Sequence, residues 1–202
     1  MSTINTDKRI IKSKKALKEA MITLMQKKDF KEITVKDLVV SADVNRGTFY
    51  KHYQFKEDIL NEIIDDVIND LIESYREPYK DMETFEISKL TSNGIKVFEH
   101  VYKYSNFYSL IVQSNILTGF QRKICDVLKN LSLQDLIVHN PNNLINRELV
   151  ASYHSYAIFG MIIEWINDGF KYSPSYMAEQ LLAIITNNAT NSIYKSNNKE
   201  KS

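Results

Sequence analysis

The side chains best suited to a chemical role lie between Asn45 and Tyr53, in the order Asn-Arg-Gly-Thr-Phe-Tyr-Lys-His-Tyr. Arginine can contact guanine through two hydrogen bonds, threonine can bond a phosphate or touch a thymine methyl, and tyrosine, lysine and histidine offer donors to phosphates and base edges. Asn45 is a good N-cap, so we expect a short helix over residues 46–52 with Phe49 pointing inward. Together with the short helix and tight turn before it in a basic segment, this helix predicts a helix-turn-helix whose second helix would lie in the major groove of DNA.

The charge distribution along the chain supports a polyanionic partner. Residues 1–56 carry 13 Lys and Arg against 6 Asp and Glu, a net charge of +7. Residues 57–202 carry 13 against 19, a net charge of −6. Such asymmetry favours a nucleic acid partner for the basic end, although a basic face is often only a solvated face.

The residues that catalysis or metal binding would need do not converge in the sequence. Cys125 is the single cysteine, so neither a disulfide framework nor a cysteine-based zinc site is expected. The histidines are scattered, and we interpret Asp65, Asp66 and Asp70 as solvated charges on a helix face rather than as paired carboxylates or metal ligands. We find no glycine-rich phosphate loop and no nucleophile elbow. We therefore expect no enzyme, no cofactor and no metal. The four histidines are His52, His100, His139 and His154.

The elements that must position these residues are all helical. Only 5 Gly and 3 Pro occur, and apolar residues recur at helical spacing. The tight turn Ala42-Asp43-Val44 suits a left-handed residue, because Asp tolerates that geometry. Thr34, with Asp37 three residues on, resembles a capping box. The expected helices cover about 8–28, 35–41, 46–52, 56–77, 85–104, 106–114, 117–131, 145–168 and 174–194, with a loop at 139–143.

The segment from Thr34 to Leu60 strongly resembles the TetR family of transcriptional regulators. The resemblance rests on the Thr-led helix, the turn, the Gly-Thr-Phe-Tyr-x-His-aromatic helix and the Lys-Glu opening of the next helix, and it covers about the first 60 residues. Asp43 departs from the family pattern, which commonly has Gly there, and Asn45 replaces a common Ser. The resemblance implies a helix-turn-helix DNA-binding domain at 1–55 and a helical dimerisation and ligand domain at 56–194. A polar tail, 195–202, is expected to be disordered.

Guided by this resemblance, we assign one set of residues to DNA. Lys36 matches a family position that reaches bases or backbone, and Thr34 caps its helix where a phosphate could meet the helix N-terminus. Lys56 adds a positive charge to a positive helix end, which suits phosphate. Whether Arg46 reads a base or holds a phosphate stays open. The predicted DNA-binding residues are Thr34, Lys36, Asn45, Arg46, Gly47, Thr48, Tyr50, Lys51, His52 and Lys56.

The C-terminal half is predicted to dimerise. The segment 145–168 is apolar over more than half of its circumference, which is more than one core stripe needs. Gly160 would permit close approach of two helices. The stretch 160–182 also resembles, more weakly, the dihydroxyacetone-kinase-regulator subgroup. The predicted interface residues are Ala157, Gly160, Met161, Trp165, Met177, Leu181, Leu182 and Ile185.

Aromatic side chains with polar tips could line a ligand cavity, as the family resemblance implies. The competing interpretation is a tyrosine-rich core whose hydroxyls reach water. The predicted ligand-binding residues are Phe98, Tyr102, Phe107, Tyr108, Tyr153 and His154.

The sequence therefore predicts a cytoplasmic, dimeric repressor that a small molecule releases from a double-stranded DNA operator. The alternative is a ligand-independent DNA-binding dimer, either an activator or an architectural protein. An enzyme on a helical bundle is the third possibility, and the sequence offers it no convergent polar site. No signal peptide is apparent in residues 1–9, and no apolar run approaches the length of a membrane span.

Overall fold

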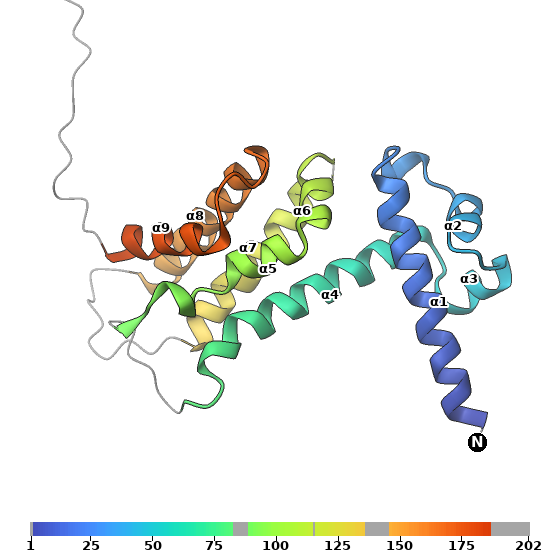
Figure 1. The fold of residues 1–202 in the computed structure, drawn as a ribbon, viewed down its shortest axis with the longest axis horizontal. Coiled ribbons are helices and arrows are strands. Elements are labelled where there is room, and N and C mark those ends of the chain that lie inside the picture. The colour runs from blue at the N-terminus through green and yellow to red at the C-terminus, as the bar shows by residue number, and fades with distance from the viewer. Residues whose placement is uncertain (1, 83–88, 115, 136–145, 187–202) are drawn as a thin grey trace, which may run out of the picture.

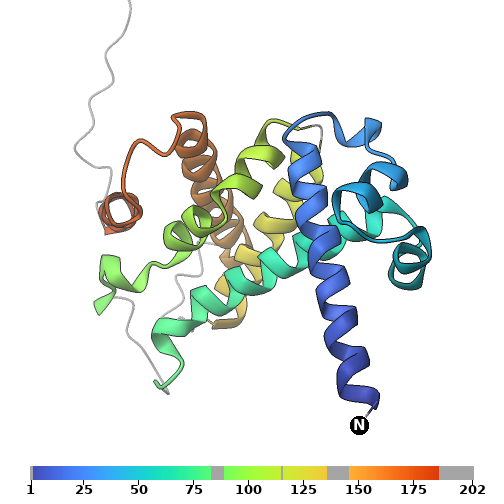
Figure 2. The same cartoon turned by 45° about the vertical axis from the view of Figure 1, so that its right-hand side comes forward.

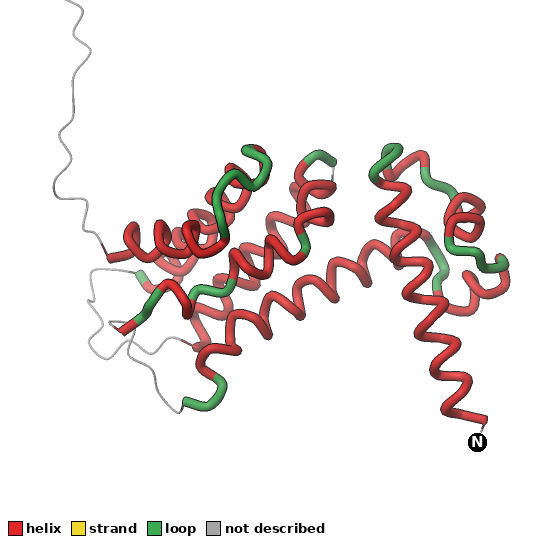
Figure 3. Tube along the Cα trace, viewed as in Figure 1, coloured by secondary structure: helices red, strands yellow, loops and turns green. Residues whose placement is uncertain are grey.

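The computed structural model describes residues 2–82, 89–114, 116–135 and 146–186. All regular secondary structure in these ranges is helical (Figures 1 and 3). The predicted all-α fold is confirmed. The tail 195–202 and the loop 139–143 lie outside the described residues. The elements are α1 Ser2–Met25, η1 Phe30–Glu32, α2 Val35–Ser41, α3 Arg46–His52, α4 Lys56–Arg76, η2 Glu77–Tyr79, η4 Ser92–Gly94, α5 Val97–Lys103, α6 Ser105–Val112, α7 Leu117–Asp135, α8 Arg147–Asn167 and α9 Pro174–Thr186.

One predicted helix, 85–104, is wrong in extent. Residues 92–94 form the short turn η4, and the α-helix begins only at Val97. Gly94 explains the break: its carbonyl accepts a hydrogen bond from the Tyr79 hydroxyl at 3.1 Å, and a Cβ at this position would lie 2.9 Å from that hydroxyl oxygen. The close approach of Tyr79 thus fixes a turn where periodicity suggested a continuous helix. At the other end of the chain, α1 begins at Ser2, earlier than the predicted residue 8.

Helices α1, α2 and α3 pack against one another around shared buried side chains. The most deeply buried of these side chains are at most 2% exposed, and they come from all three helices and from the residue that follows η1. α1 packs against both α2 and α3, which lie on the side of α1 away from the C-terminal helices (Figure 1). These central residues are Leu17, Met21, Ile33, Leu38 and Phe49.

Helix α4 joins these three helices to the C-terminal helices. Its seven buried side chains follow helical spacing from Ile59 to Leu71, and it packs on α1 at one end and on α5 and α7 further along (Figures 1 and 2). Ion pairs tie it on both sides. Glu62 accepts from Lys14 at 2.7 Å and from Lys18 at 3.3 Å, both on α1. At the far end, Arg76 bonds Asp135 of α7 through two nitrogens.

The C-terminal helices α5–α9 continue the same core beyond α4, in a part that is rich in aromatic rings. α8 runs against α7 more extensively than any other described pair, while α9 covers α5 and η4. Trp165 is 2% exposed, and its indole N–H donates to the Tyr172 carbonyl at 3.0 Å, which holds the loop between α8 and α9. Both Gly169 and Phe170 in that loop have positive φ, as in the left-handed turns that end helices.

Helix α8 is long and apolar enough, by length and composition alone, to cross a membrane. Core helices pass the same test. Here six of its side chains are buried in the protomer, and it packs against α6 and α7. It is therefore a helix of the folded domain and not a membrane span, and its remaining apolar surface is described below.

The turn between α2 and α3 carries its strain at Asp43, whose φ is +51°. The Val44 N–H donates to the Val39 carbonyl at 3.0 Å and the Asp43 N–H to the Val40 carbonyl at 3.3 Å, a pattern typical of a glycine-terminated helix. The left-handed geometry predicted for this aspartate is confirmed.

We expect Asp43→Gly to raise the free energy of unfolding by about 0.5 kcal/mol, because glycine adopts positive φ without the steric cost of a Cβ but loses more chain entropy. The matched control is Ala42→Gly. Ala42 has helical dihedral angles, so glycine there should lower stability by about 0.5–1 kcal/mol. Urea denaturation of both variants measures the difference. If both glycine substitutions change the free energy of unfolding in the same direction, this account of the turn is contradicted.

Candidate nucleic-acid interface and C-terminal apolar face

Two capped helices set the geometry of the predicted DNA-binding unit. Thr34 caps α2: its hydroxyl oxygen accepts from the Asp37 N–H at 3.2 Å, and its own N–H donates to the Asp37 carboxylate at 2.9 Å. Lys28 also donates to Asp37, at 2.8 Å. Hydrogen bonds from Lys28 and Thr34 hold the pKa of Asp37 far below its ordinary value. The capping box predicted from Thr34 and Asp37 is therefore confirmed, with Asp in place of the usual Glu.

Asn45 begins α3 in the same way. Its side-chain oxygen accepts from the Thr48 N–H at 2.7 Å and from the Thr48 hydroxyl at 3.1 Å. A Cβ at Gly47 would lie 3.2 Å from that oxygen, so the glycine leaves the cap unhindered. The primary role of Asn45 in the structure is thus to cap the helix, and the Thr48 hydroxyl is turned toward the cap.

The outer surface of the unit is polar and basic. Lys36 on α2 and Arg46, Tyr50 and Lys51 on α3 are exposed, with Tyr50 at 55%. Arg46 lies in the first turn of α3, where the side chains of a recognition helix reach base edges. Val40 is 72% exposed and, four residues after Lys36, shares its helix face. Sequence analysis did not single out Val40, because a valine at helical spacing looks like core.

The remaining aromatic residues of α3 support the helix. Phe49 is fully buried and Tyr53 is 5% exposed, and their ring centroids lie 6.0 Å apart. His52 is half-buried. Burial, together with the nearby positive charges of Lys14 and Lys51, lowers the pKa of His52, so its ring favours the neutral form. A neutral imidazole can still donate or accept a hydrogen bond, but it adds no charge to the face.

Lys56 does not present its charge outward as predicted. Its ammonium donates to the carbonyls of Phe30, Ile33 and Lys31 at 2.7, 2.8 and 3.1 Å, and it lies 4.6 Å from the Phe30 ring centroid. These bonds use the three donors of the ammonium. The first residue of α4 thus fastens the η1 turn, and we remove it from the predicted contact set. The sequence held no signal for this role, because carbonyl acceptors carry no side-chain identity.

The C-terminal face differs from the predicted interface set. Trp165, Met177 and Leu181 lie in the protomer core, so the structure contradicts their assignment to a surface. Met161 and Leu182 are partly buried. Ala157 and Gly160 are exposed, and Ile185 is 45% exposed.

An apolar face nevertheless runs along α8 and α9. On α8, exposed apolar residues recur every three or four positions and therefore share one side of the helix. Leu149 and Tyr153 are 70% and 71% exposed, and Ile184 on α9 is 61% exposed. We call this surface the α8–α9 face. It consists of Leu149, Tyr153, Tyr156, Ala157, Gly160, Tyr172, Tyr176, Ile184 and Ile185.

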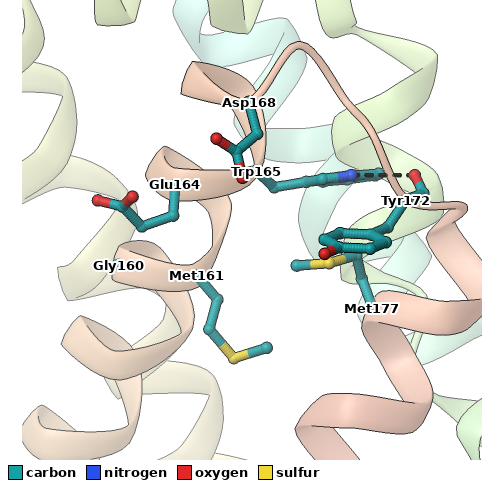
Figure 4. Close-up of a pocket in the computed structure, with 7 residues that line it drawn as sticks. All are labelled: Gly160, Met161, Glu164, Trp165, Asp168, Tyr172 and Met177. Atoms are coloured by element: carbon teal, nitrogen blue, oxygen red, sulfur yellow. Dashed lines mark hydrogen bonds between the residues drawn. The ribbon is translucent and has the colours of Figure 1, made fainter.

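A hollow of about 260 Å³ lies where the α8–α9 face meets the connecting loop, and Figure 4 shows the residues that line it. Met161 and Met177 reach toward it from the two helices, and the Tyr172 ring forms one wall. Its lining is chiefly apolar, with Glu164 and Asp168 at the rim of α8. A second hollow, of about 440 Å³, lies between α4 and α5. It is lined by Ser74, Glu77, Lys96, Glu99, His100 and Lys103.

The six predicted ligand-binding residues do not come together around a cavity. Phe98, Phe107 and Tyr108 are buried and pack on other rings, with Phe98 next to Trp165 and the other two next to Phe120. The other three are exposed, Tyr102 on α5 and Tyr153 and His154 on α8. None of the six lines either hollow. Phe98, Phe107 and Tyr108 therefore fit the alternative interpretation, in which the aromatic residues form a core and do not line a cavity.

The two capped helices α2 and α3, joined by a tight turn and carrying a basic outer face, have the arrangement of a helix-turn-helix. Comparison with known proteins supports this class. The chain matches the pattern described as "Bacterial regulatory proteins, tetR family" over residues 13–63. Residues 89–187 match "Transcriptional regulator C-terminal region". The chain belongs to the TetR family of transcriptional regulators, whose members regulate transcription by binding DNA and are not enzymes.

Similar proteins are distant in sequence. The uncharacterized HTH-type transcriptional regulator YxbF of Bacillus subtilis (strain 168) is 23% identical over 173 residues, which is 84% of this chain and 44% of that protein. The chain therefore spans less than half the length of this relative.

Solved structures share the fold. A TetR transcriptional regulator from Streptococcus agalactiae 2603V has a TM-score of 0.61 at 21% identity, over 91% of this chain and 99% of that one. The dihydroxyacetone kinase operon activator DhaS has a TM-score of 0.61 at 19% identity, over 86% and 93%. A TetR-family protein from Syntrophomonas wolfei has a TM-score of 0.62 at 16% identity, over 85% and 92%.

We expect Lys56→Met to lower the free energy of unfolding by about 1–3 kcal/mol, because three carbonyls lose their shared donor. Lys36→Met, which alters an exposed lysine of α2, should change stability by less than about 0.5 kcal/mol. Chemical denaturation of the two variants makes the comparison. Equal losses would mean that the carbonyl contacts of Lys56 do not stabilise the domain.

Proposed function

We propose that the chain is a dimeric, sequence-specific DNA-binding regulator that represses its operator in the cytoplasm and is released by a small molecule. The observation that carries the DNA-binding part is the exposed side of α3, where Arg46, Tyr50 and Lys51 project from a helix whose start is fixed by the Asn45 cap. In a symmetric dimer, two such helices about one helical turn of DNA apart would meet successive major grooves of a palindrome.

The α8–α9 face supports the dimer. Several large apolar side chains on the exposed sides of α8 and α9 leave a surface that a monomer would rarely carry. A second copy can cover it with the same surface, since a two-fold interface joins identical patches. Gly160 supports close approach of the two α8 helices, because a Cβ there would have no neighbour within 4 Å in the protomer.

The hollow between α4 and α5 supports release by a ligand. It borders α4, the helix that joins the DNA-binding domain to the C-terminal helices. A molecule that binds more tightly when α4 is displaced would shift the population away from the DNA-binding arrangement.

The ligand-independent alternative has an observation of its own. Phe98, Phe107 and Tyr108 fill the C-terminal core with their own rings, as a regulator without an aromatic ligand cavity would require. The name of the structural neighbour DhaS describes that protein as an operon activator, so activation is the alternative sign of regulation.

The first test is binding to the DNA upstream of the chain's own gene, followed by fluorescence anisotropy with excess random competitor. We expect competitor-resistant binding that Arg46→Ala weakens by roughly 1–3 kcal/mol, about 5- to 150-fold, because a base-edge contact is lost. Arg122→Ala removes an exposed guanidinium from α7 and should bind like wild type. If the two variants bind equally, Arg46 does not read DNA. If the wild type fails to bind this DNA at every salt concentration tested, the DNA-binding proposal fails for this site.

The dimer is tested with two matched glycines. Gly160 on α8 and Gly119 on α7 both leave open space at Cβ in the protomer, so Gln at either position should fold. We expect Gly160→Gln to shift the sedimentation coefficient from dimer toward monomer, because the side chain would intrude between two α8 helices. Gly119→Gln should remain dimeric. A wild-type monomer at micromolar concentration, or equal behaviour of the two variants, would argue against the α8–α9 interface.

A further inference from the structure

A chain of polar groups, buried at His100 and Tyr108, links the bridge helix α4 to α5 and α6. His100 of α5 is only 2% exposed. Its Nδ1 lies 2.9 Å from the Asp70 carboxylate of α4, and its Nε2 lies 3.0 Å from the Tyr108 hydroxyl of α6. Lys103 of α5 donates to the other oxygen of Asp70 at 2.5 Å. Asp70 is therefore held by two groups on α5.

The partners of the ring fix its protonation. An ionised carboxylate only accepts hydrogen bonds, so Nδ1 carries the proton and donates to Asp70. In a neutral ring Nε2 then accepts, and the Tyr108 hydroxyl is its donor. Burial lowers the pKa of His100, against the opposing effect of Asp70. Burial also raises the pKa of Tyr108, so its hydroxyl keeps the proton that it donates. In the neutral form each group has its partner.

A proton on Nε2 would break this chain. The ring would then donate toward Tyr108, and the tyrosine O–H would have to turn to another acceptor. Tyr108 is 1% exposed and packs against the rings of Phe107 and Phe120, and the part of the chain that the structure describes gives its hydroxyl no second partner. The new charge would also lie close to Lys103.

Other groups near His100 do not replace the lost acceptor. The hollow beside the ring contains Ser74 on α4, Glu77 at the start of η2 and Lys96 and Glu99 on α5, and Lys96 donates to both oxygens of Glu99. The Tyr104 ring lies 5.0 Å from the imidazole, between centroids. α9 also packs on α5 but contributes no residue to this hollow. The charges around His100 are thus mixed, and Asp70 is the carboxylate bonded to it.

The position of α4 matters at its other end. About two turns and one turn before Asp70, Glu62 and Asp66 bond Lys14 and Lys18 of α1, which packs on the helix-turn-helix. A shift of α5 and α6 relative to α4 would therefore be transmitted to the DNA-binding domain through a helix that is fastened on both sides.

We propose that His100 is a positioning residue for α4: the neutral ring holds the DNA-binding arrangement, and protonation of the ring weakens operator binding. This inference rests on the proposed DNA-binding function. The arrangement seen here is favoured while His100 is neutral and loses that advantage as the pH falls below the ordinary imidazole range, because forms that expose the ring take up the proton first.

The titration of His100 is the first test, by NMR of the full chain with labelled histidine. Tyr108→Phe should raise the midpoint, because the neutral ring loses its donor. Asp70→Asn should lower it, because the proton loses its carboxylate. The control Tyr75→Phe, which removes the hydroxyl of a half-buried tyrosine on α4, should leave the midpoint unchanged. A histidine that only fills space would show no opposite shifts, and that result would overturn the proposal.

Operator affinity is the second test, measured for wild type and His100→Gln between pH 8 and pH 5. Glutamine keeps an acceptor for Tyr108 but takes up no proton, and both proteins retain His52, so the ratio of their affinities isolates His100. We expect wild type to lose about fivefold or more relative to the variant as the pH falls, within the usual range of coupling between sites. By reciprocity, operator DNA should lower the His100 midpoint.

A constant affinity ratio, or a midpoint that DNA does not move, would overturn this inference while leaving the DNA-binding function intact. Wild-type protein that binds no operator at any pH would overturn both.

Discussion

Helix α4 carries one hydrophobic core from the N-terminal helices to the C-terminal helices, and the arrangement of the other helices depends on that continuity. Its buried face, from Ile59 to Leu71, packs on α1 at one end and on α5 and α7 further along. Because interiors are close-packed, α4 cannot move against either set of helices without repacking its contacts there. Ion pairs from α4 to α1 and to α7 add contacts of defined geometry to this apolar packing. The two parts of the molecule are therefore coupled through one rigid element rather than through a loose linker.

The part of the fold that local chemistry dictates could be predicted from sequence. Thr34 and Asn45 are cap residues at the starts of α2 and α3, and Asp43 is one of the few side chains that accept positive φ between them. These signals act within four residues, so reading them requires no knowledge of the tertiary structure. The exposed basic face followed from the same segment, since the apolar Phe49 fixes which side of α3 turns inward.

The missed features are those that distant contacts decide. Lys56 looks like a surface cation until three carbonyls from the η1 region surround it. Gly94 ends a helical pattern because Tyr79, fifteen residues earlier, bonds its carbonyl. Trp165 and Tyr153 are both apolar residues of α8, but their spacing puts the first in the core and the second on the surface. The apolar composition of α8 indicated more apolar surface than one core needs. Only its packing against α6 and α7 identifies which side remains exposed.

The internal bonds of the basic domain have a consequence for its charge. Lys14, Lys18 and Lys28 are paired with carboxylates, and Lys56 is bonded to carbonyls, so the net charge of the first 56 residues overstates the field that faces outward. DNA carries a layer of condensed counterions, and only cations that reach its phosphates displace them. The number of ions released on binding should therefore reflect the few free cations around α2 and α3. A tight complex of this protein would then owe a larger share of its affinity to shape and base contacts than its basic composition suggests.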